Sequence, residues 1–226
     1  MRKIGLTNNQ LKLIAMLTMT IDHIGYILFP RVVWLRLVGR LAFPIFAYMI
    51  AEGCSHTRSL KRYLGSMVAM AAVSQVVSFV VMGSLMQCIM VTFSLSIGLI
   101  ILAKWAKEKP SVFRWGLFAV GVVTCFGISE LLPRVVKGFT IDYNFIGIIL
   151  PVCIYLVRGK LAKLGVSLVC LGILAADAWW GQWFSLLSIP LLALYNGQRG
   201  EWRIKWLFYF YYPAHLALLW LVSFIV

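Results

Sequence analysis

Long apolar runs that follow one another with only short breaks constrain this chain more than any other feature. Of its 226 residues, 62% are apolar and only 12% are charged, whereas charged residues make up about a quarter of ordinary soluble domains. A helix needs roughly 20 apolar residues to cross about 30 Å of hydrocarbon, and nearly the whole sequence divides into runs of this kind. We therefore expect an all-α, polytopic integral membrane helical bundle with a single membrane-embedded domain over residues 1–226.

The breaks between the apolar runs predict about nine transmembrane helices. The eighth run is short and contains Pro190, so a tilted or re-entrant segment is an alternative to a full crossing there. If that run does not cross, the C-terminus changes sides. The expected spans are 11–29, 35–54, 62–83, 86–106, 113–132, 141–157, 161–178, 183–196 and 205–225.

Lysine and arginine are distributed unevenly between the connections, which indicates the orientation because cytoplasmic loops carry an excess of these residues. With nine spans, fifteen of them share a side with the N-terminus and four lie on the other side. We therefore expect a cytoplasmic N-terminus. The fifteen are Arg2, Lys3, Arg58, Lys61, Arg62, Lys104, Lys107, Lys109, Arg114, Arg158, Lys160, Lys163, Arg199, Arg203 and Lys205, and the four are Arg31, Arg36, Arg134 and Lys137.

The net charge of +14 does not indicate nucleic-acid binding, because the basic residues form short clusters between apolar runs rather than one solvated face. Topology and contact with anionic membrane lipids explain this charge. The five cysteines are widely spaced and show no metal-ligand pattern. We interpret them as packing residues and expect no metal site.

Ionisable residues inside the expected spans are the strongest functional signal, since a charge in hydrocarbon costs at least a few kcal/mol and needs a partner. Lys12 and His23 are eleven residues apart, so a helix places them on one face with a rise of about 16 Å between them. Lys12 would then lie at the cytoplasmic mouth of the first span and His23 beyond the midplane. The alternative is a snorkelling lysine and a separately satisfied histidine.

The second span runs back toward the cytoplasm and carries two more charges. The rise per residue places Arg40 at the depth of Asp22 and His23. Glu52 falls near Lys12 at the cytoplasmic end. We expect Arg40 to contact Asp22 or His23, and a purely structural pair with Asp22 is an open alternative. Because adjacent helical residues point about 100° apart, another span must supply the group that orients His23.

The last span and the loop after the second span add the remaining candidates. His215 comes to about the level of His23, and Pro213 frees a carbonyl beside it. The basic loop could hold the phosphates of a nucleotide-like cofactor, although positive-inside sorting alone would also produce it. Its residues are His56, Arg58, Lys61 and Arg62.

Three stretches resemble the TraX family of bacterial membrane proteins in their residues and in their order along the chain: LKLIAMLTMTIDHIGYILFP, LRLVGRLAFPIFAYMIAEGCSHTRSLKRYL, and YNGQRG followed by KWLFYFYYPAHL. The likeness covers about the first 65 and the last 30 residues, whereas the middle carries only a weak likeness in TFSLSIGL and DYNFIGIILP. The resemblance implies a multi-pass protein of the bacterial cytoplasmic (inner) membrane.

TraX proteins are named for acetylation of the N-terminus of conjugative pilin, and the family is grouped with acyltransferase type 3 enzymes, which take acyl groups from cytoplasmic acyl-CoA. Those relatives carry a basic residue, ten residues and a histidine in the first span, and Lys12 and His23 have this spacing. The resemblance implies an acyltransferase that uses acetyl-CoA or another acyl-CoA as co-substrate. This chain departs from those relatives in having about nine spans rather than ten or more and no appended soluble domain. Two classes of acceptor therefore remain as alternatives, a pilin N-terminus and a surface glycan or lipid.

On this hypothesis His23 is the general base, since imidazole titrates near neutrality, and Arg40 or His215 stabilises the developing charge. Asp22 completes the candidate catalytic group. The candidate cofactor-binding residues are Lys12, Glu52, His56, Arg58, Lys61 and Arg62. Two other hypotheses remain open: a proton-coupled transporter or flippase whose relay is formed by Asp22, His23, Glu52 and His215, and a non-catalytic assembly factor for a surface polymer or pilus.

The charge distribution makes a topological prediction. A reporter fused after Lys109 should report a cytoplasmic location and one fused at the C-terminus an external location, because the count of basic residues places these points on opposite sides. Reporter activity in intact cells measures this. The same location for both fusions would mean that the segment around Pro190 does not cross.

Overall fold

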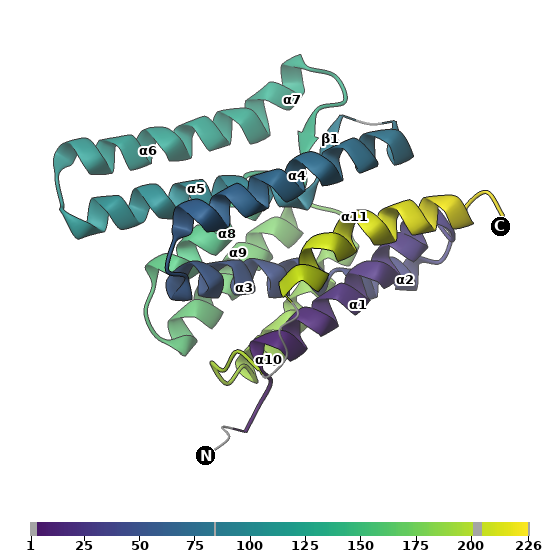
Figure 1. Cartoon of the computed structure of the whole chain (residues 1–226), viewed down its shortest axis with the longest axis horizontal. Helices are drawn as coiled ribbons and strands as arrows, with labels where there is room; N and C mark the ends of the chain where they lie inside the picture. Colours follow the sequence, from purple (N-terminus) through teal and green to yellow (C-terminus); the bar gives the residue numbers. More distant parts are fainter. Residues whose placement is uncertain (1–3, 84, 201–204, 226) are drawn as a thin grey trace. The chain divides into compact units, whose positions relative to one another are not determined.

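The computed structural model of the chain describes residues 4–83, 85–200 and 205–225 and is 78% helical, which confirms the all-α prediction (Figure 1). Arg2, Lys3 and Arg203, which the charge count assigns to the cytoplasmic side, lie outside the described residues. The chain divides into two compact units, a terminal unit of residues 1–49 and 159–226 and a central unit of residues 50–158. Whether the chain forms a single domain stays a prediction.

The terminal unit brings together the two ends of the chain. Within it α1 packs against α2 and α11, and the 3₁₀-helix η2 packs against α2 and α9. Figure 1 shows α11 in yellow beside α1 in purple. The elements are α1 (Asn8–Ile27), α2 (Val33–Gly39), the first part of α3 (Ala42–His56), α9 (Lys160–Ala176), η2 (Trp180–Leu187), α10 (Ser188–Ala193) and α11 (Lys205–Val222).

A loop near the end of the chain fixes the start of α1. The N–H of Leu6 donates to the carbonyl of Leu194 at 2.8 Å. Thr7 and Gln10 form a capping box, in which each side chain accepts a hydrogen bond from the other residue's backbone N–H. Gly200 has a φ of +89°, and a Cβ there would lie 3.0 Å from a side-chain atom in the first turn of α1. Glycine is needed at this point because it tolerates both the conformation and the close approach.

The second predicted span is one apolar helical stretch, Val33–His56, with a break between α2 and α3. The break has an identifiable cause in Pro44. Proline has no N–H to donate to the carbonyl of Arg40, four residues earlier, so the α-helical hydrogen-bond ladder cannot pass through this point. The N–H of Arg40 instead donates to the carbonyl of Leu37, three residues back, at 3.2 Å. The break leaves Arg40 at the end of α2.

The central unit is organised around α5. This helix packs against α4, α6 and α8, and a pair of two-residue strands runs parallel beside it. The elements are α4 (Leu60–Met82), β1 (Met86–Gln87), α5 (Ile89–Glu108), α6 (Val112–Phe126), the π-helix η1 (Gly127–Leu131), α7 (Leu132–Val135), β2 (Thr140–Ile141) and α8 (Asn144–Leu156).

Two buried hydroxyls one helical turn apart join α5 to the α8 region. Thr92 Oγ1 donates to the carbonyl of Asp142 at 2.9 Å, and Ser96 Oγ donates to the carbonyl of Ile148 at 2.7 Å. A Cβ added at Gly147 would lie 3.1 Å from Thr92 Cγ2. Small residues and shared hydroxyls of this kind let helices approach closely in a membrane, where packing rather than the hydrophobic effect drives helix association.

Four helical stretches of the described chain are long and apolar enough to cross a membrane by length and composition: Val33–His56, Leu60–Val80, Ile89–Glu108 and Val112–Val135. Asn144–Leu156 and Phe210–Val222 are shorter apolar helices. The eighth predicted span is a 3₁₀-helix of 8 residues followed by an α-helix of 6 residues. The protein therefore has the helices of a membrane protein, while the number of nine spans and the orientation of the N-terminus stay predictions.

Replacing Ser96 by alanine should destabilise the protein by about 0.5–2 kcal/mol, because it removes a hydrogen bond between helices in an apolar setting. Ser94→Ala is the matched control, since Ser94 Oγ donates to Met90 within α5 itself. Unfolding of both purified variants in detergent measures the difference. Equal stability losses for the two variants would contradict the role given to Ser96.

Candidate functional site

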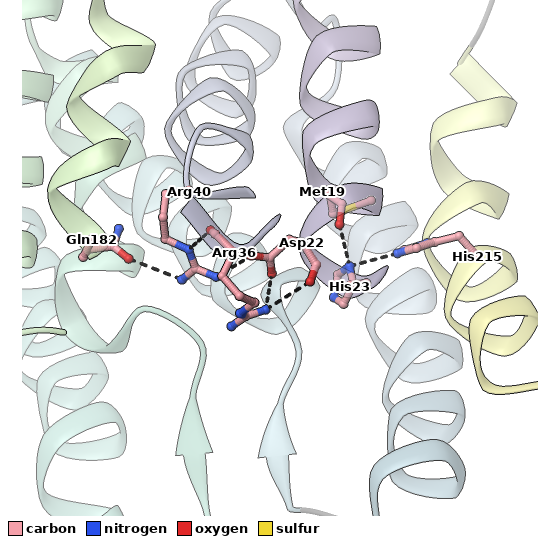
Figure 2. Close-up of polar contacts among 7 residues, drawn as sticks. All are labelled: Met19, Asp22, His23, Arg36, Arg40, Gln182 and His215. Atoms are coloured by element: carbon pink, nitrogen blue, oxygen red, sulfur yellow. Dashed lines mark hydrogen bonds and ion pairs between the residues drawn. The ribbon is translucent and has the colours of Figure 1, made fainter. Parts of the chain in front are cut away.

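An ion-pair layer in the terminal unit is built around Asp22 of α1 (Figure 2). Its Oδ2 lies 2.6 Å from Arg36 Nη1, and its Oδ1 lies 2.7 Å from Arg40 Nη2. The side chains of Asp22 and Arg40 are 14% and 12% exposed, and that of Arg36 is 28% exposed. The prediction that Arg40 contacts Asp22 or His23 is confirmed, with Asp22 as the partner.

The guanidinium of Arg40 is held by further contacts. Its Nε donates to the carbonyl of Arg36 at 3.2 Å, and its Nη1 donates to Gln182 Oε1 on η2 at 3.4 Å. Because the guanidinium can only donate, the amide of Gln182 must present its oxygen to Arg40. Gln182 Nε2 is left buried, with no hydrogen-bond partner in the part of the chain that the structure describes. The layer thus joins three elements, α1, α2 and η2.

Gly39 makes the ion-pair layer possible. A Cβ at this position would lie 2.2 Å from Asp22 Cβ, so any larger residue would push α1 and α2 apart. Gly25 allows a second close approach, since a Cβ there would lie 2.7 Å from Leu35 Cβ. The two helices thus meet through a small residue on each of them, Gly25 on α1 and Gly39 on α2.

Two histidines form the second part of the site. Nε2 of His215 on α11 lies 3.1 Å from Nδ1 of His23 on α1, and the ring centroids are 4.9 Å apart (Figure 2). His23 Nδ1 also lies 2.9 Å from the carbonyl of Met19. Among the described residues, no hydrogen bond joins His23 to Asp22. The expectation that another span supplies the group facing His23 is therefore confirmed, and that group is His215.

Aromatic side chains hold His215 in place. Tyr211 stacks on its ring with a centroid distance of 5.1 Å and an interplanar angle of 13°, and Tyr212 packs edge-on at 5.5 Å. The hydroxyl of Tyr211 hydrogen-bonds Thr20 of α1. The same segment of α11 that carries His215 is thus tied to α1 within one turn of His23.

Lys12 belongs to the same uninterrupted helix as His23. Since α1 runs from Asn8 to Ile27 without a break, helical geometry keeps the two side chains on one face, about 16 Å apart along the axis. The shared face follows from the fold, and the assignment of Lys12 to a cofactor stays a prediction.

The remaining candidates lie in the central unit, at the α3–α4 connection. Nδ1 of His56 lies 2.8 Å from the carbonyl of Glu52 and 3.8 Å from its carboxylate, and the side chain of His56 is 71% exposed. Arg58, Lys61 and Arg62 are exposed, and the last two occupy the first turn of α4. Cations are disfavoured at a helix N-terminus, so these residues do not stabilise α4. That they serve one ligand together with Lys12 stays a prediction.

Two residues of the site were not predicted from the sequence. Arg36 was assigned to an external connection, although it lies in α2 and binds Asp22. The spacing of four between Arg36 and Arg40 was the available signal, because it places both on one helix face. Gln182 offered a weaker signal as a single amide within an apolar, tryptophan-rich segment.

Comparison with known proteins places this geometry in context. The model of a family described as TraX protein matches residues 7–223. The probable fimbrial assembly protein FimC, serogroup H1, of Dichelobacter nodosus is 24% identical over 249 residues, which cover 96% of each chain. An uncharacterised protein of Rickettsia prowazekii (strain Madrid E) is 48% identical over 44 residues, 19% of this chain and 18% of that protein. No solved structure matches the chain significantly.

Removing the carboxylate of Asp22 should destabilise the fold by roughly 3–5 kcal/mol, because Asp22→Ala leaves two guanidinium groups without their partner in an apolar setting. Glu108→Ala is the control, since Glu108 forms an exposed pair with Lys104 at 3.9 Å and such pairs contribute about 0–1 kcal/mol. Unfolding in detergent measures both. A loss for Asp22→Ala no larger than that for Glu108→Ala would exclude a structural ion-pair layer.

Proposed function

The chain belongs to the TraX protein family, and from this we propose that it is an acyltransferase of the bacterial inner membrane that moves an acyl group, such as acetyl, from cytoplasmic acyl-CoA to a hydroxyl or amine. We propose the N-terminus of a pilin or a cell-surface glycan as the acceptor. The name of the Dichelobacter nodosus relative, a probable fimbrial assembly protein, supports an acceptor linked to pilus assembly.

The observation that carries the proposal is the fixed position of His23 on the helix that also carries Lys12. The ring of His23 contacts a backbone carbonyl of α1 and the buried His215. A general base needs this kind of fixed position, because its rate advantage depends on the geometry of proton transfer. Lys12 lies about three helical turns away on the same face, as an extended donor with phosphates at one end and a thioester at the other requires.

The reaction that we propose is a direct transfer. His23 takes the proton of the acceptor hydroxyl or amine while the acceptor atom attacks the thioester carbonyl carbon. The carbon–sulfur bond then breaks, and the sulfur of CoA takes up the proton. Lys12 holds a phosphate of the donor as a point charge.

The ion-pair layer supports this chemistry from a distance. Arg40 binds Asp22 and Gln182, so its donors are already engaged in fixing α1 against α2 and η2. We propose that Asp22 and Arg40 keep α1 in register and thereby set the position of His23. Their contribution to catalysis is then positional.

A non-catalytic role in pilus assembly is the second candidate, and the name of the Dichelobacter nodosus relative, a probable fimbrial assembly protein, favours it. In that case the protein has no acyl-CoA site and both histidines can be replaced without consequence. Under a transporter function the same absence of donor binding is expected. Donor binding therefore separates the enzyme from both alternatives.

His23→Ala should leave folding and acyl-CoA binding nearly intact and reduce transfer by about 10²–10⁴, which is the usual contribution of a positioned base. Lys12→Ala should do the reverse and weaken donor binding by about 1–3 kcal/mol, as expected for a charge-assisted hydrogen bond. Calorimetry measures binding and CoA release measures turnover.

Lys104→Ala serves as the control, because it removes an exposed lysine that pairs with Glu108. It should change neither donor binding nor turnover. If the folded wild-type protein binds neither acetyl-CoA nor a longer-chain donor, the enzyme hypothesis fails.

A further inference from the structure

We propose that His215 is the positioning residue of His23: it fixes the orientation of the His23 ring, whose Nδ1 carries the proton, and it stabilises the imidazolium formed during transfer. The inference rests on the proposed function in taking His23 as the base. It assigns a role that differs from charge stabilisation at the substrate, because His215 acts on His23 itself.

The hydrogen bonds of His215 determine its own tautomer. Its Nδ1 lies 2.8 Å from the carbonyl of Tyr211. A carbonyl oxygen only accepts, so Nδ1 of His215 carries the proton and donates it. In a neutral imidazole the other nitrogen then has the lone pair. Nε2 of His215 is therefore an acceptor, and it faces Nδ1 of His23 at 3.1 Å.

The contacts of His23 determine its tautomer, and the carbonyl of Met19 alone already requires a proton on Nδ1. Nδ1 of His23 faces two acceptors, the carbonyl of Met19 at 2.9 Å and Nε2 of His215 at 3.1 Å. Only a protonated Nδ1 satisfies both, by sharing its hydrogen between them. Nε2 of His23 is then the basic atom, and within the described part of the chain no protein group hydrogen-bonds it. On the proposed function, this is the nitrogen that takes the proton of the acceptor.

The same geometry suits the imidazolium form. When Nε2 of His23 takes a proton from the acceptor, Nδ1 keeps its own proton and neither hydrogen bond has to change. The lone pair of His215 then faces a cation, which strengthens that hydrogen bond in the low-dielectric interior. The proton on Nε2 passes to the departing sulfur of CoA, so His23 ends the cycle neutral and in its starting tautomer.

A neutral partner suits an apolar environment better than the carboxylate that orients histidine in soluble triads. A second carboxylate beside His23 would need its own counter-charge in the membrane. The carboxylate adjacent in sequence, Asp22, is already bound by Arg36 and Arg40. His215 needs no counter-charge, and the stacked ring of Tyr211 and the edge of Tyr212 fix its rotamer.

Two amide substitutions at His215 separate a positioning role from a purely structural one. The terminal atoms of glutamine reach about as far as Nε2 of histidine, so His215→Gln can still offer an oxygen to His23 Nδ1. The shorter asparagine reaches only as far as Nδ1, so His215→Asn keeps a donor for the carbonyl of Tyr211 and loses the contact with His23. The two variants are similar in polarity and differ in which contact they preserve.

We expect His215→Asn to lower kcat by about 10–10²-fold, the loss expected when one hydrogen bond to a charged group is removed, and to leave the KM for acetyl-CoA nearly unchanged. His215→Gln should restore most of this loss. Thermal unfolding and acetyl-CoA binding check that both variants are folded. Equal kcat values for the two variants, or a loss confined to KM, would overturn the positioning role.

NMR of the wild-type protein with ¹⁵N-labelled histidine tests the tautomer without any assay of activity. The chain has three histidines, so loss of one signal set in His23→Ala assigns the spectrum. We expect a protonated Nδ1 and an unprotonated Nε2 at His23. The opposite tautomer in a protein that transfers acyl groups would overturn this inference alone, whereas the expected tautomer in a protein without transfer would overturn the proposed function alone.

Discussion

The terminal unit depends on one carboxylate that is shared between two arginines in an apolar setting. An unpaired charge inside a membrane is costly, so Asp22 and Arg40 each require a partner wherever they are buried. The contact can form only if the backbones of α1 and α2 come very close, which Gly39 permits. Arg40 itself lies at the end of α2, where Pro44 interrupts the hydrogen-bond ladder. The ion-pair layer therefore depends on Gly39 and Pro44 as well as on its three charged residues, Asp22, Arg36 and Arg40.

The ion-pair layer fixes α1 against α2, and α1 carries His23 and Lys12, the groups of the proposed reaction. The N-terminus of the helix is bound by the loop that contains Gly200, its far end is joined to α2, and α11 packs along it. Each contact comes from a different part of the chain. The histidine pair is consequently held by packing on several sides, which suits a group that must present one nitrogen in a constant direction. Within the described part of this layer, the buried Nε2 of Gln182 has no hydrogen-bond partner.

Much of this arrangement could be predicted from the sequence, and the reasons for the failures are physical. Apolar length predicted the helices well, because a segment that must satisfy its backbone internally has few other choices. Rise per residue predicted the pairing of Asp22 with Arg40, since depth is nearly a linear function of position in a span. Arg36 was misplaced in the count of basic residues in the connections. The second span was expected to begin at residue 35, and the arginine beside that boundary was treated as a loop residue. The contact between His23 and His215 could not be predicted, because it depends on which atoms of two distant rings face each other.

The contact between His23 and His215 also has a consequence for how the protein is made. The two residues are 192 positions apart, with His23 in the first helix and His215 in the last. A ribosome delivers the first helix to the membrane long before the last one, and during that interval His23 lacks the neighbour that fixes its ring. A nascent or prematurely terminated chain therefore inserts most of its helices without a completed histidine pair. Synthesis of α11 is therefore the step that completes the histidine pair, and a chain that ends before α11 lacks it.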